Sequence, residues 1–297
     1  MTSPATYGIA APEYRLPAET TLGTVHLQIA DLTRSVAYYR DVIGLRVLSA
    51  TLDSAVLGAH DDPHAIIALH ELKGAAPVPG RGRLGLFHVA ILLPDRASLG
   101  RFLGHLAARG EQPGMSDHLV SEAIYLTDPD GLGIEIYADR DRSTWRADEL
   151  QLRMATEPLD VQRVLAAAAG VPWSGAPAGT RVGHVHLHVG DLSGAEAFYH
   201  AGLGFDKTVW QYPGALFLAA GGYHHHVGTN TWARGAESAR STEARLLEWQ
   251  VQLPSVHDVQ QLAAHLQHRQ IVATTDGASL LVPDPWGTRV RVLPQSR

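Results

Sequence analysis

The sequence predicts an α+β fold built from four copies of one module, a strand followed by a helix and three more strands. Two observations support this prediction. Segments with the alternating pattern of a strand are each followed by an apolar stripe at helical spacing. The second half of the chain also repeats landmarks of the first at an offset of 160 residues, so that Tyr39 recurs as Tyr199 and Gly44 as Gly204. Long-range self-similarity of this kind indicates duplication.

The first module is expected over residues 22–75. Residues 22–32 alternate between apolar and other side chains, which predicts a strand. Asp31 is a candidate cap for the helix that follows, and Gly44 is a candidate end of that helix. Three short strands are expected after the helix, at 45–51, 54–57 and 65–72.

The second module is expected over residues 83–140. It begins with a strand at 85–93 and a helix at 97–109, whose apolar residues form one stripe. Two further strands are joined by an Asp-Pro-Asp-Gly turn at 128–131, which recurs as Asp-Pro-Trp-Gly at 284–287. Those two strands are expected at 124–127 and 133–137.

The repeat divides the chain into two pairs of modules. Residues 1–140 are predicted to hold the N-terminal pair and residues 181–297 the C-terminal pair. The link at 141–180 contains a predicted helix at 159–169 and then a stretch rich in glycine and proline. The two modules of the C-terminal pair are expected at 181–235 and 245–295.

The composition argues against several classes of function. A net charge of −6 disfavours a nucleic-acid binder with a broad basic face, and the absence of cysteine excludes thiolate metal sites and cysteine nucleophiles. No apolar run is long enough to cross a bilayer, and residues 1–20 lack the apolar core of a signal peptide, so a cytoplasmic protein is predicted. Seventeen histidines stand against five phenylalanines, which directs attention to metal binding and proton transfer.

Three histidines alternate with aliphatic residues on the first strand of the third module. His184, His186 and His188 should therefore share one face of that strand and line a polar cavity. Alternate residues lie roughly 6–7 Å apart along a strand, so we do not expect all three to bind one metal ion. His184 alone is predicted as a ligand, with His186 and His188 shaping the cavity around it.

Several motifs resemble the vicinal oxygen chelate superfamily, which includes glyoxalase I, bleomycin and fosfomycin resistance proteins, and type I extradiol dioxygenases. The motifs are the Asp-Leu-x-x-Ser-x-x-Tyr-Tyr and Ala-x-x-Phe-Tyr-x-x-x-Leu-Gly-Phe helices and the Asp-Pro-Asp-Gly turn. Four modules in one chain point to the dioxygenases, and the run at 221–232 resembles the catechol 2,3-dioxygenase branch typified by the Bacillus enzymes. The resemblance implies two cupped barrels of mixed sheet.

The resemblance also implies which positions hold a metal ion, but the answer depends on how the modules pair. Pairing one with two, and three with four, gives the sets Thr24/His88/Glu135 and His184/Glu248/Arg291, and neither is a good site. Pairing two with three gives His88, Glu135 and His184, the two-histidine, one-carboxylate set of non-haem Fe(II) oxygenases. We expect the second pairing, with Fe(II) as the metal and Mn(II) as the alternative. A site in module one completed by His26 remains open.

The same resemblance assigns roles around that metal. His225 is expected to be the acid/base histidine, with His224 beside it. Tyr125 is expected to donate a hydrogen bond to the metal-proximal oxygen of the substrate. His118, His186, His224 and Asn230 are expected to line the substrate pocket, whereas the link residues Trp145, Trp173 and Met154 are expected in the core or covering the barrel.

The sequence therefore predicts an Fe(II)-dependent extradiol dioxygenase that opens a catechol-type ring with O2 to give a semialdehyde. Its expected partners are a small aromatic diol and O2, with no nucleic acid and no membrane, and a homo-oligomer is compatible with the sequence. Two alternatives stay open: a glyoxalase-type metal-dependent lyase or isomerase, and a non-catalytic protein that binds small aromatic molecules.

Overall fold

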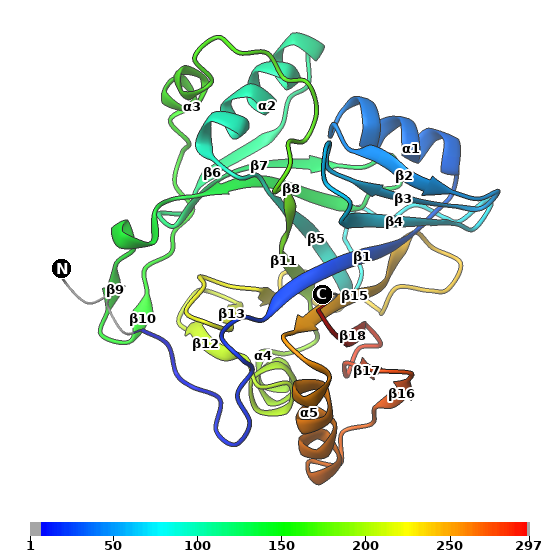
Figure 1. The fold of residues 1–297 in the computed structure, drawn as a ribbon, viewed down its shortest axis with the longest axis vertical. Helices are drawn as coiled ribbons and strands as arrows, with labels where there is room; N and C mark the ends of the chain where they lie inside the picture. Colours follow the sequence, from blue (N-terminus) through cyan, green and yellow to red (C-terminus); the bar gives the residue numbers. More distant parts are fainter. Residues whose placement is uncertain (1–6, 296–297) are drawn as a thin grey trace.

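The computed structural model describes residues 7–295 and contains two eight-stranded mixed sheets (Figure 1). The first sheet curls as a half-barrel and has the strand order β12-β13-β14-β11-β5-β8-β7-β6. Its strands are β5 (Gly85–Leu92), β6 (Gly114–Asp117), β7 (Ser121–Thr127), β8 (Gly133–Asp139), β11 (Arg181–His188), β12 (Asp206–Val209), β13 (Ala215–Ala219) and β14 (Val227–Asn230).

The second sheet combines strands from the two ends of the chain, in the order β16-β17-β18-β15-β1-β4-β3-β2. Its strands are β1 (Thr21–Ile29), β2 (Arg46–Ala50), β3 (Ser54–Gly58), β4 (Ala65–Glu71), β15 (Arg245–Leu253), β16 (Thr274–Asp276), β17 (Ser279–Pro283) and β18 (Arg289–Pro294). The α+β class that the sequence predicts is confirmed. Each sheet contains strands from both halves of the chain.

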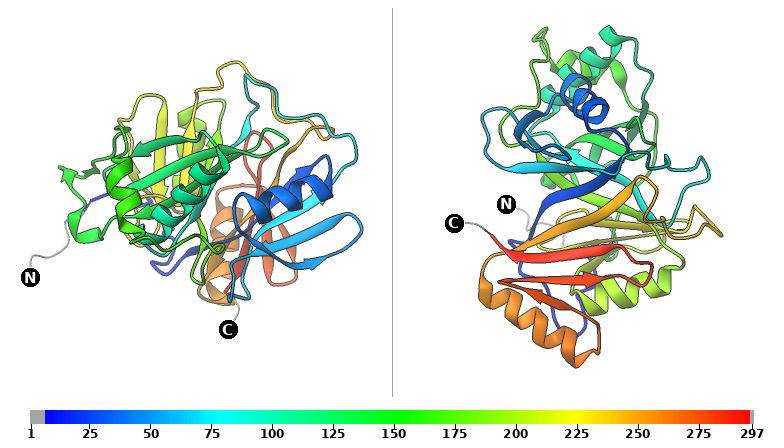
Figure 2. Two further views of the ribbon diagram at one scale, coloured as in Figure 1. Left: turned by 90° about the horizontal axis from the view of Figure 1, so that it is seen from above. Right: turned by 90° about the vertical axis from the view of Figure 1, so that its right-hand side faces the viewer.

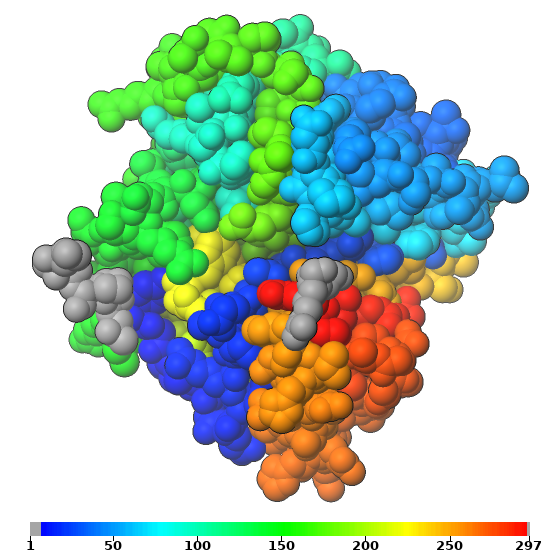
Figure 3. Space-filling model, in the orientation of Figure 1, coloured from blue at the N-terminus to red at the C-terminus, as the bar shows by residue number. Residues whose placement is uncertain are grey.

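Helices cover the two ends of the molecule, with the sheets between them (Figures 1 and 2). One end holds α1 (Leu32–Asp41), α2 (Arg96–Arg109) and α3 (Val161–Ala167); the other holds α5 (Val256–His268) and α4 (Leu192–Ala195), which continues into the π-helical η2 (Glu196–Gly202). Figure 3 shows the blue N-terminal part of the chain crossing the middle of the surface between these ends. No helix within residues 7–295 has the length and apolarity needed to span a membrane.

The helix caps follow from the sequence. The Asp31 carboxylate accepts the backbone N–H of Arg34, as predicted for the start of α1, and Asp191 caps α4 in the same way. Helix α2 begins one residue before its predicted start, and α3 is two residues shorter than predicted at each end. These differences lie at helix ends, where the sequence pattern is weakest.

Three short strands were not located in the sequence. The module pattern requires β6, at the edge of the first sheet, but no position was predicted for it, and the two-stranded ribbon of β9 (Ala147–Asp148) and β10 (Gln151–Leu152) in the link was not expected. The link also contains the single turn η1 (Arg142–Thr144). Segments of two to four residues are too short to show a period of alternation, so only their tertiary contacts define them.

The central joint of the first sheet is the antiparallel pairing of β11 with β5. In this register His186 lies opposite His88, and His184 lies opposite Ala90. On its other side β5 pairs in parallel with β8, which places Ala90 beside Glu135. Residues far apart in the sequence are thus brought to one region of the sheet.

Two buried tyrosines tie helices to turns at equivalent places in the repeat. The Tyr199 hydroxyl donates to Asp284 Oδ2 at 2.8 Å, and the Tyr39 hydroxyl lies 3.4 Å from Asp128 Oδ2. Each aspartate also accepts backbone N–H groups of its own turn, which fixes the turn against the helix. The tyrosines and aspartates that recur in the two halves of the sequence therefore contact each other within each half.

We predict that Tyr199→Phe lowers the free energy of unfolding by about 1–2 kcal/mol, because it leaves a buried carboxylate without its hydroxyl donor. Tyr39→Phe should cost less, because its hydrogen bond is long. Urea unfolding followed by circular dichroism measures both. Tyr38→Phe is the control, since the Tyr38 hydroxyl has no hydrogen-bond partner among residues 7–295. A cost for Tyr38→Phe equal to that for Tyr199→Phe would contradict the interpretation.

Candidate metal centre and active site

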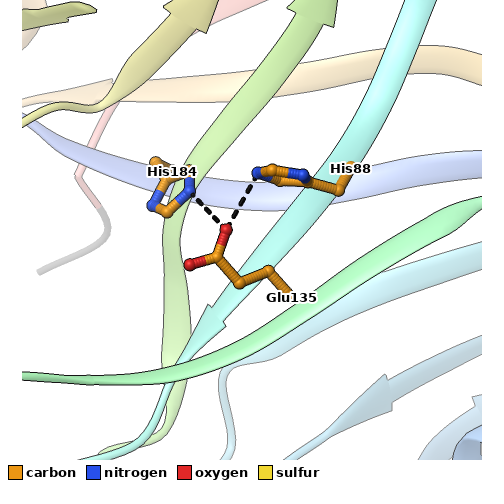
Figure 4. Close-up of side chains that lie close together, drawn as sticks. All are labelled: His88, Glu135 and His184. Atoms are coloured by element: carbon orange, nitrogen blue, oxygen red, sulfur yellow. Dashed lines mark hydrogen bonds and ion pairs between the residues drawn. The ribbon is translucent and has the colours of Figure 1, made fainter. Parts of the chain in front are cut away.

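Three adjacent strands bring His88, Glu135 and His184 together (Figure 4). Glu135 Oε2 lies 2.9 Å from His88 Nε2 and 3.2 Å from His184 Nε2. His88 stands on β5, Glu135 on β8 and His184 on β11, so the three side chains come from neighbouring strands of the curled sheet. One carboxylate oxygen points between the two imidazoles (Figure 4).

All three side chains are buried, and burial sets their charge. The exposed fractions are 5% for His88 and 2% for both Glu135 and His184. Burial lowers the pKa of His184 to about 4, although the nearby Glu135 opposes this, so its imidazole is neutral near pH 7. Burial raises the pKa of Glu135, but the adjacent His184 and His88 outweigh it and hold that pKa well below its usual range.

This donor set fits a divalent transition metal. The candidate ligand atoms lie within 4.8 Å of one another. His88 Nε2 is buried and close to Glu135 but is not aligned for a hydrogen bond. Buried polar atoms are normally paired, so this nitrogen favours an additional ligand beside the carboxylate. Neutral imidazoles and one carboxylate are the ligands that Fe(II) and similar ions prefer.

The corresponding positions in the second sheet hold an ion pair instead. Arg291 donates to both carboxylate oxygens of Glu248, at 2.6 and 3.1 Å. His26, considered as a substitute ligand, lies on β1 with its Nδ1 3.0 Å from His70 Nε2. Thr24, also on β1, contributes a hydroxyl near the Ala65 carbonyl. A guanidinium already lies beside the only carboxylate of this set.

A pocket of about 290 Å³ opens over the triad. Most of its wall is apolar or aromatic. Three link residues, Met154, Ala155 and Thr156, line it, so Met154 contributes to the pocket wall rather than only to the core or the barrel cover that the sequence predicted. Besides the triad, its lining residues are Phe87, Ser116, His118, Tyr125, Met154, Ala155, Thr156, His186, Tyr212, Phe217, His225 and Trp232.

The structure places His225 in the pocket and His224 behind it. The ring of His225 lies 4.0 Å from that of His184, centroid to centroid, and its Nδ1 lies 2.7 Å from His224 Nδ1. His224 is fully buried, and its Nε2 is 2.9 Å from Asp139 Oδ1. Burial and the surrounding imidazoles of His184 and His224 lower the pKa of His225 well below its usual value.

His224 was expected in the pocket lining, but it lies behind His225. Strand β13 ends at Ala219, and an irregular turn follows before β14 begins at Val227. The three histidines lie in this turn, and of the three His225 lines the pocket. His226 is directed to the other side, where its Nδ1 accepts the backbone N–H of Ala220.

Tyr125 and His118 form a hydrogen-bonded pair on the opposite wall. His118 Nδ1 lies 2.6 Å from the Ala155 carbonyl, which can only accept, so this nitrogen carries the proton. His118 Nε2 lies 2.5 Å from the hydroxyl of Tyr125. The hydroxyl of Tyr125 is thus held at the pocket wall by His118. Burial, with Glu135 nearby, raises the pKa of Tyr125 well above its usual value.

Asn230 supports the histidine strand from behind. Its Nδ2 donates to His186 Nε2 at 3.0 Å, and its Oδ1 lies 2.7 Å from His188 Nδ1. The expectation that Asn230 lines the pocket was therefore not met, since the amide is fully buried and engaged with the two rings. Gly228 makes room for His186, because a Cβ there would lie 2.9 Å from the ring.

Comparison with known proteins identifies the family. The sequence profile described as Glyoxalase/Bleomycin resistance protein/Dioxygenase superfamily matches residues 21–136. The chain is 43% identical over 271 residues to the catechol-2,3-dioxygenase of Bacillus subtilis (strain 168), covering 90% of this chain and 94% of that protein. The chain belongs to the glyoxalase/bleomycin resistance/dioxygenase superfamily. The resemblance inferred from the motifs is confirmed.

Solved structures support the superfamily fold. A candidate dioxygenase of Bacillus subtilis superposes with a TM-score of 0.65 at 10% identity, over 99% of this chain and 87% of that chain. Glyoxalase I of Zea mays gives a TM-score of 0.51 at 17% identity, over 93% and 92% of the two chains. At these identities the likeness concerns the fold alone.

Sequence reasoning missed several residues in and behind the pocket. Asp139, which contacts His224 behind the pocket, lies four residues after Glu135 on β8, so the period of the strand could have placed both on one face. Phe87 precedes His88 on β5 and could not be found in that way, because the pairing of β5 with β11 is irregular at this point. Thr156 and Tyr212 come from two irregular segments that a 2.8 Å hydrogen bond joins.

We predict that Glu135→Ala and His184→Ala each weaken metal binding by more than about tenfold, since even indirect contacts to a metal ligand contribute that much. Metal per chain is measured by mass spectrometry after anaerobic loading with Fe(II) and desalting. His64→Ala is the control, because its side chain is 83% exposed and distant from the triad in the fold. Full metal retention in both triad variants would contradict this assignment.

Proposed function

We propose that the protein is an Fe(II)-dependent extradiol dioxygenase that opens a catechol-type ring with O2. The observation that supports this most directly is the buried His-Glu-His triad under an aromatic-lined pocket, in a chain 43% identical to a catechol-2,3-dioxygenase. Both atoms of O2 enter the product, and the bond broken is the ring C–C bond beside the diol. The product is a ring-opened semialdehyde, so atoms balance without a further reductant.

In this proposal His88, Glu135 and His184 hold Fe(II), with Mn(II) as the alternative ion. When bound, the metal would lower the pKa values of the diol and hold it close to O2. The burial of the triad keeps bulk water from its ligands. The neutral state of His184 leaves its nitrogen lone pair free for coordination.

His225 serves as the acid/base group in this scheme. It lines the pocket beside His184, and the low pKa of its ring makes it a neutral acceptor near pH 7. It therefore takes a proton from one hydroxyl of the diol and returns it later in the reaction. Tyr125, held by His118 at the pocket wall, donates a hydrogen bond to the metal-proximal oxygen of the diol in this scheme. His186 completes the wall, held by Asn230.

We also propose that the four strand–helix runs are duplicated modules and that modules two and three build this site. Supporting the proposal, His88 and Glu135 come from the run 83–140 and His184 and His225 from the run 181–235. Residues 141–180 then act as more than a link, since Met154 and Thr156 reach the pocket. Modules one and four supply the second sheet, with its Glu248–Arg291 pair.

The expected activity is O2 uptake when catechol is added to protein loaded anaerobically with Fe(II). One O2 should be consumed for each catechol, with formation of the semialdehyde, because both oxygen atoms are retained. An oxygen electrode and mass spectrometry with ¹⁸O2 measure this. Loaded protein that binds catechol without consuming O2 would favour a binding protein. Isomerisation of a hemithioacetal in place of O2 uptake would favour the glyoxalase-type alternative.

We predict that His225→Gln lowers kcat by about 10²–10⁴-fold, the usual contribution of an acid/base group, while metal content stays unchanged. Steady-state O2 uptake and metal analysis measure the two quantities. The neighbouring His226→Gln is the matched control, since His226 does not line the pocket over the triad. Equal losses in both variants would show that the effect is structural.

A further inference from the structure

We propose that the pocket selects uncharged catechols, unsubstituted or with a small apolar substituent, and rejects catechols that carry a carboxylate. The proposal rests on the proposed function, because it concerns which diol the same site accepts. It follows from the residues that line the pocket away from the triad, where the ring and its substituents would lie.

The outer wall of the pocket is built from apolar side chains. Phe87 and Trp232 meet edge to face, with ring centroids 5.6 Å apart, and Tyr212 and Phe217 meet in the same way at 5.6 Å. Met154 adds a flexible apolar surface from the link. Contact with these walls favours the binding of a ring with an alkyl or halogen substituent, because apolar surface is buried.

No cation lines this pocket. Within residues 7–295 its lining contains no lysine and no arginine, and its one carboxylate, Glu135, belongs to the triad. The histidine His118 has both ring nitrogens engaged, one with the Ala155 carbonyl and one with the Tyr125 hydroxyl. The hydroxyls of Thr156 and Tyr212 bond to each other at 2.8 Å.

The adjoining surface supplies one cation, which is already paired with a carboxylate. The cavity that shares Met154, Ala155 and Tyr212 with the pocket is also lined by charged side chains, Asp148, Arg153 and Glu157. Arg153 lies 3.3 Å from Asp148, and both side chains are exposed. This patch has two carboxylates and one guanidinium, so it favours approach by a neutral or cationic ring rather than an anionic one.

We therefore expect a large difference in affinity between an anionic and a neutral ligand of the same shape. A substrate carboxylate buried against these walls loses its hydration and finds no guanidinium or ammonium partner, only neutral donors such as the Ser116 hydroxyl, which is unfavourable. The volume of about 290 Å³ is at the small end of the ~300–1,000 Å³ typical of ligand sites, so a substituent has little room to turn away. The charge of a substituent should therefore affect the affinity for a catechol more than the size of the substituent does.

The test compares 4-ethylcatechol with 3,4-dihydroxyphenylacetate, which differ by a methyl group against a carboxylate. We expect kcat/KM to be at least about 100-fold higher for 4-ethylcatechol, or about 2.7 kcal/mol at 1.36 kcal/mol per tenfold. Catechol itself is the reference. Values within tenfold of each other, or a preference for the acid, would overturn the proposal.

A binding measurement separates this proposal from the proposed function. Calorimetric Kd values for both ligands on protein loaded with redox-inert Zn(II) should show the same order. If the Fe(II) protein does not turn over catechol, the dioxygenase assignment fails, and these Kd values still decide the ligand preference. Met154→Arg should reduce the ratio of Kd values at least tenfold, whereas the control Met154→Leu should preserve it. An unchanged ratio in folded Met154→Arg would count against the proposal.

A hydrogen-bond chain behind His225 supports a second proposal. We infer that Asp139 is a positioning residue that fixes which nitrogen of His225 faces the substrate. The Asp139 carboxylate can only accept, so His224 Nε2, 2.9 Å away, is the donor. The two Nδ1 atoms of His224 and His225 are 2.7 Å apart and need one proton between them. With the proton of His224 placed on Nε2 by Asp139, its Nδ1 accepts and His225 Nδ1 is the donor.

The hydrogen-bond chain therefore leaves Nε2 of His225 unprotonated in the pocket, which is the form that a base requires. The hydrogen bonds select the tautomer of the His225 ring and leave its charge unchanged. Asp139 is held in turn by Tyr223, whose hydroxyl donates to the same oxygen at 3.2 Å. That hydroxyl lies 2.7 Å from the hydroxyl of Tyr137. The carboxylate is thus fixed from two sides.

The experiment uses Asp139→Ala to remove the acceptor and Asp139→Asn to keep an acceptor oxygen. We expect ¹⁵N shifts of His225, read by NMR in the Zn(II)-loaded protein, to report the Nδ1–H tautomer in the wild type and Asp139→Asn. In Asp139→Ala they should report a mixture. With Fe(II), kcat should fall at least tenfold in Asp139→Ala with KM within twofold, and Asp139→Asn should restore most of it.

Asp276→Ala is the matched control, an aspartate on β16 of the second sheet with a 72% exposed side chain. It should leave both the tautomer and kcat unchanged. A wild-type tautomer in folded Asp139→Ala would overturn the proposal, as would Asp139→Asn behaving like Asp139→Ala. The NMR result does not depend on turnover, so it remains decisive if the protein is not a dioxygenase.

Discussion

The antiparallel pairing of β5 with β11 is the constraint on which the whole site depends. A shift of one residue in a strand turns every side chain to the opposite face. His88 and His184 would then point away from each other, and Glu135 would be left without them. Apolar residues on the other face, including Val89 and Val185, are fully buried, and they fix the register by the same hydrophobic effect that stabilises the sheet.

The polar groups around the triad are arranged so that each ring has one orientation. Asn230 sets His186 and His188, the Ala155 carbonyl sets His118, and Asp139 sets His224. Fully satisfied buried networks of this kind are rigid, because a turned ring would leave a polar atom unpaired. The nitrogens that remain without protein partners are those beside the carboxylate and in the pocket, where chemistry is expected.

The sequence was most informative where regular strands hold the functional residues. The metal-ligand set His88, Glu135 and His184 followed from strand positions, a repeat and a resemblance, and the structure brings those three side chains together. It was less informative where the chain is irregular. The turn after β13 reverses the expected facing of His224, and Met154 reaches the pocket from a link with no period of its own. Such segments are positioned by distant contacts, such as Thr156 with Tyr212.

The two sheets stabilise a buried carboxylate in two different ways. Each holds a buried carboxylate at one of the corresponding ligand positions, Glu135 on β8 in the first and Glu248, the counterpart of His88, on β15 in the second, and a buried carboxylate is costly unless a cation is close. In the second sheet Arg291 supplies a permanent charge through two hydrogen bonds. In the first sheet the partners are imidazoles, and His184 is neutral near pH 7. A metal ion between them would supply the positive charge that Arg291 supplies in the second sheet.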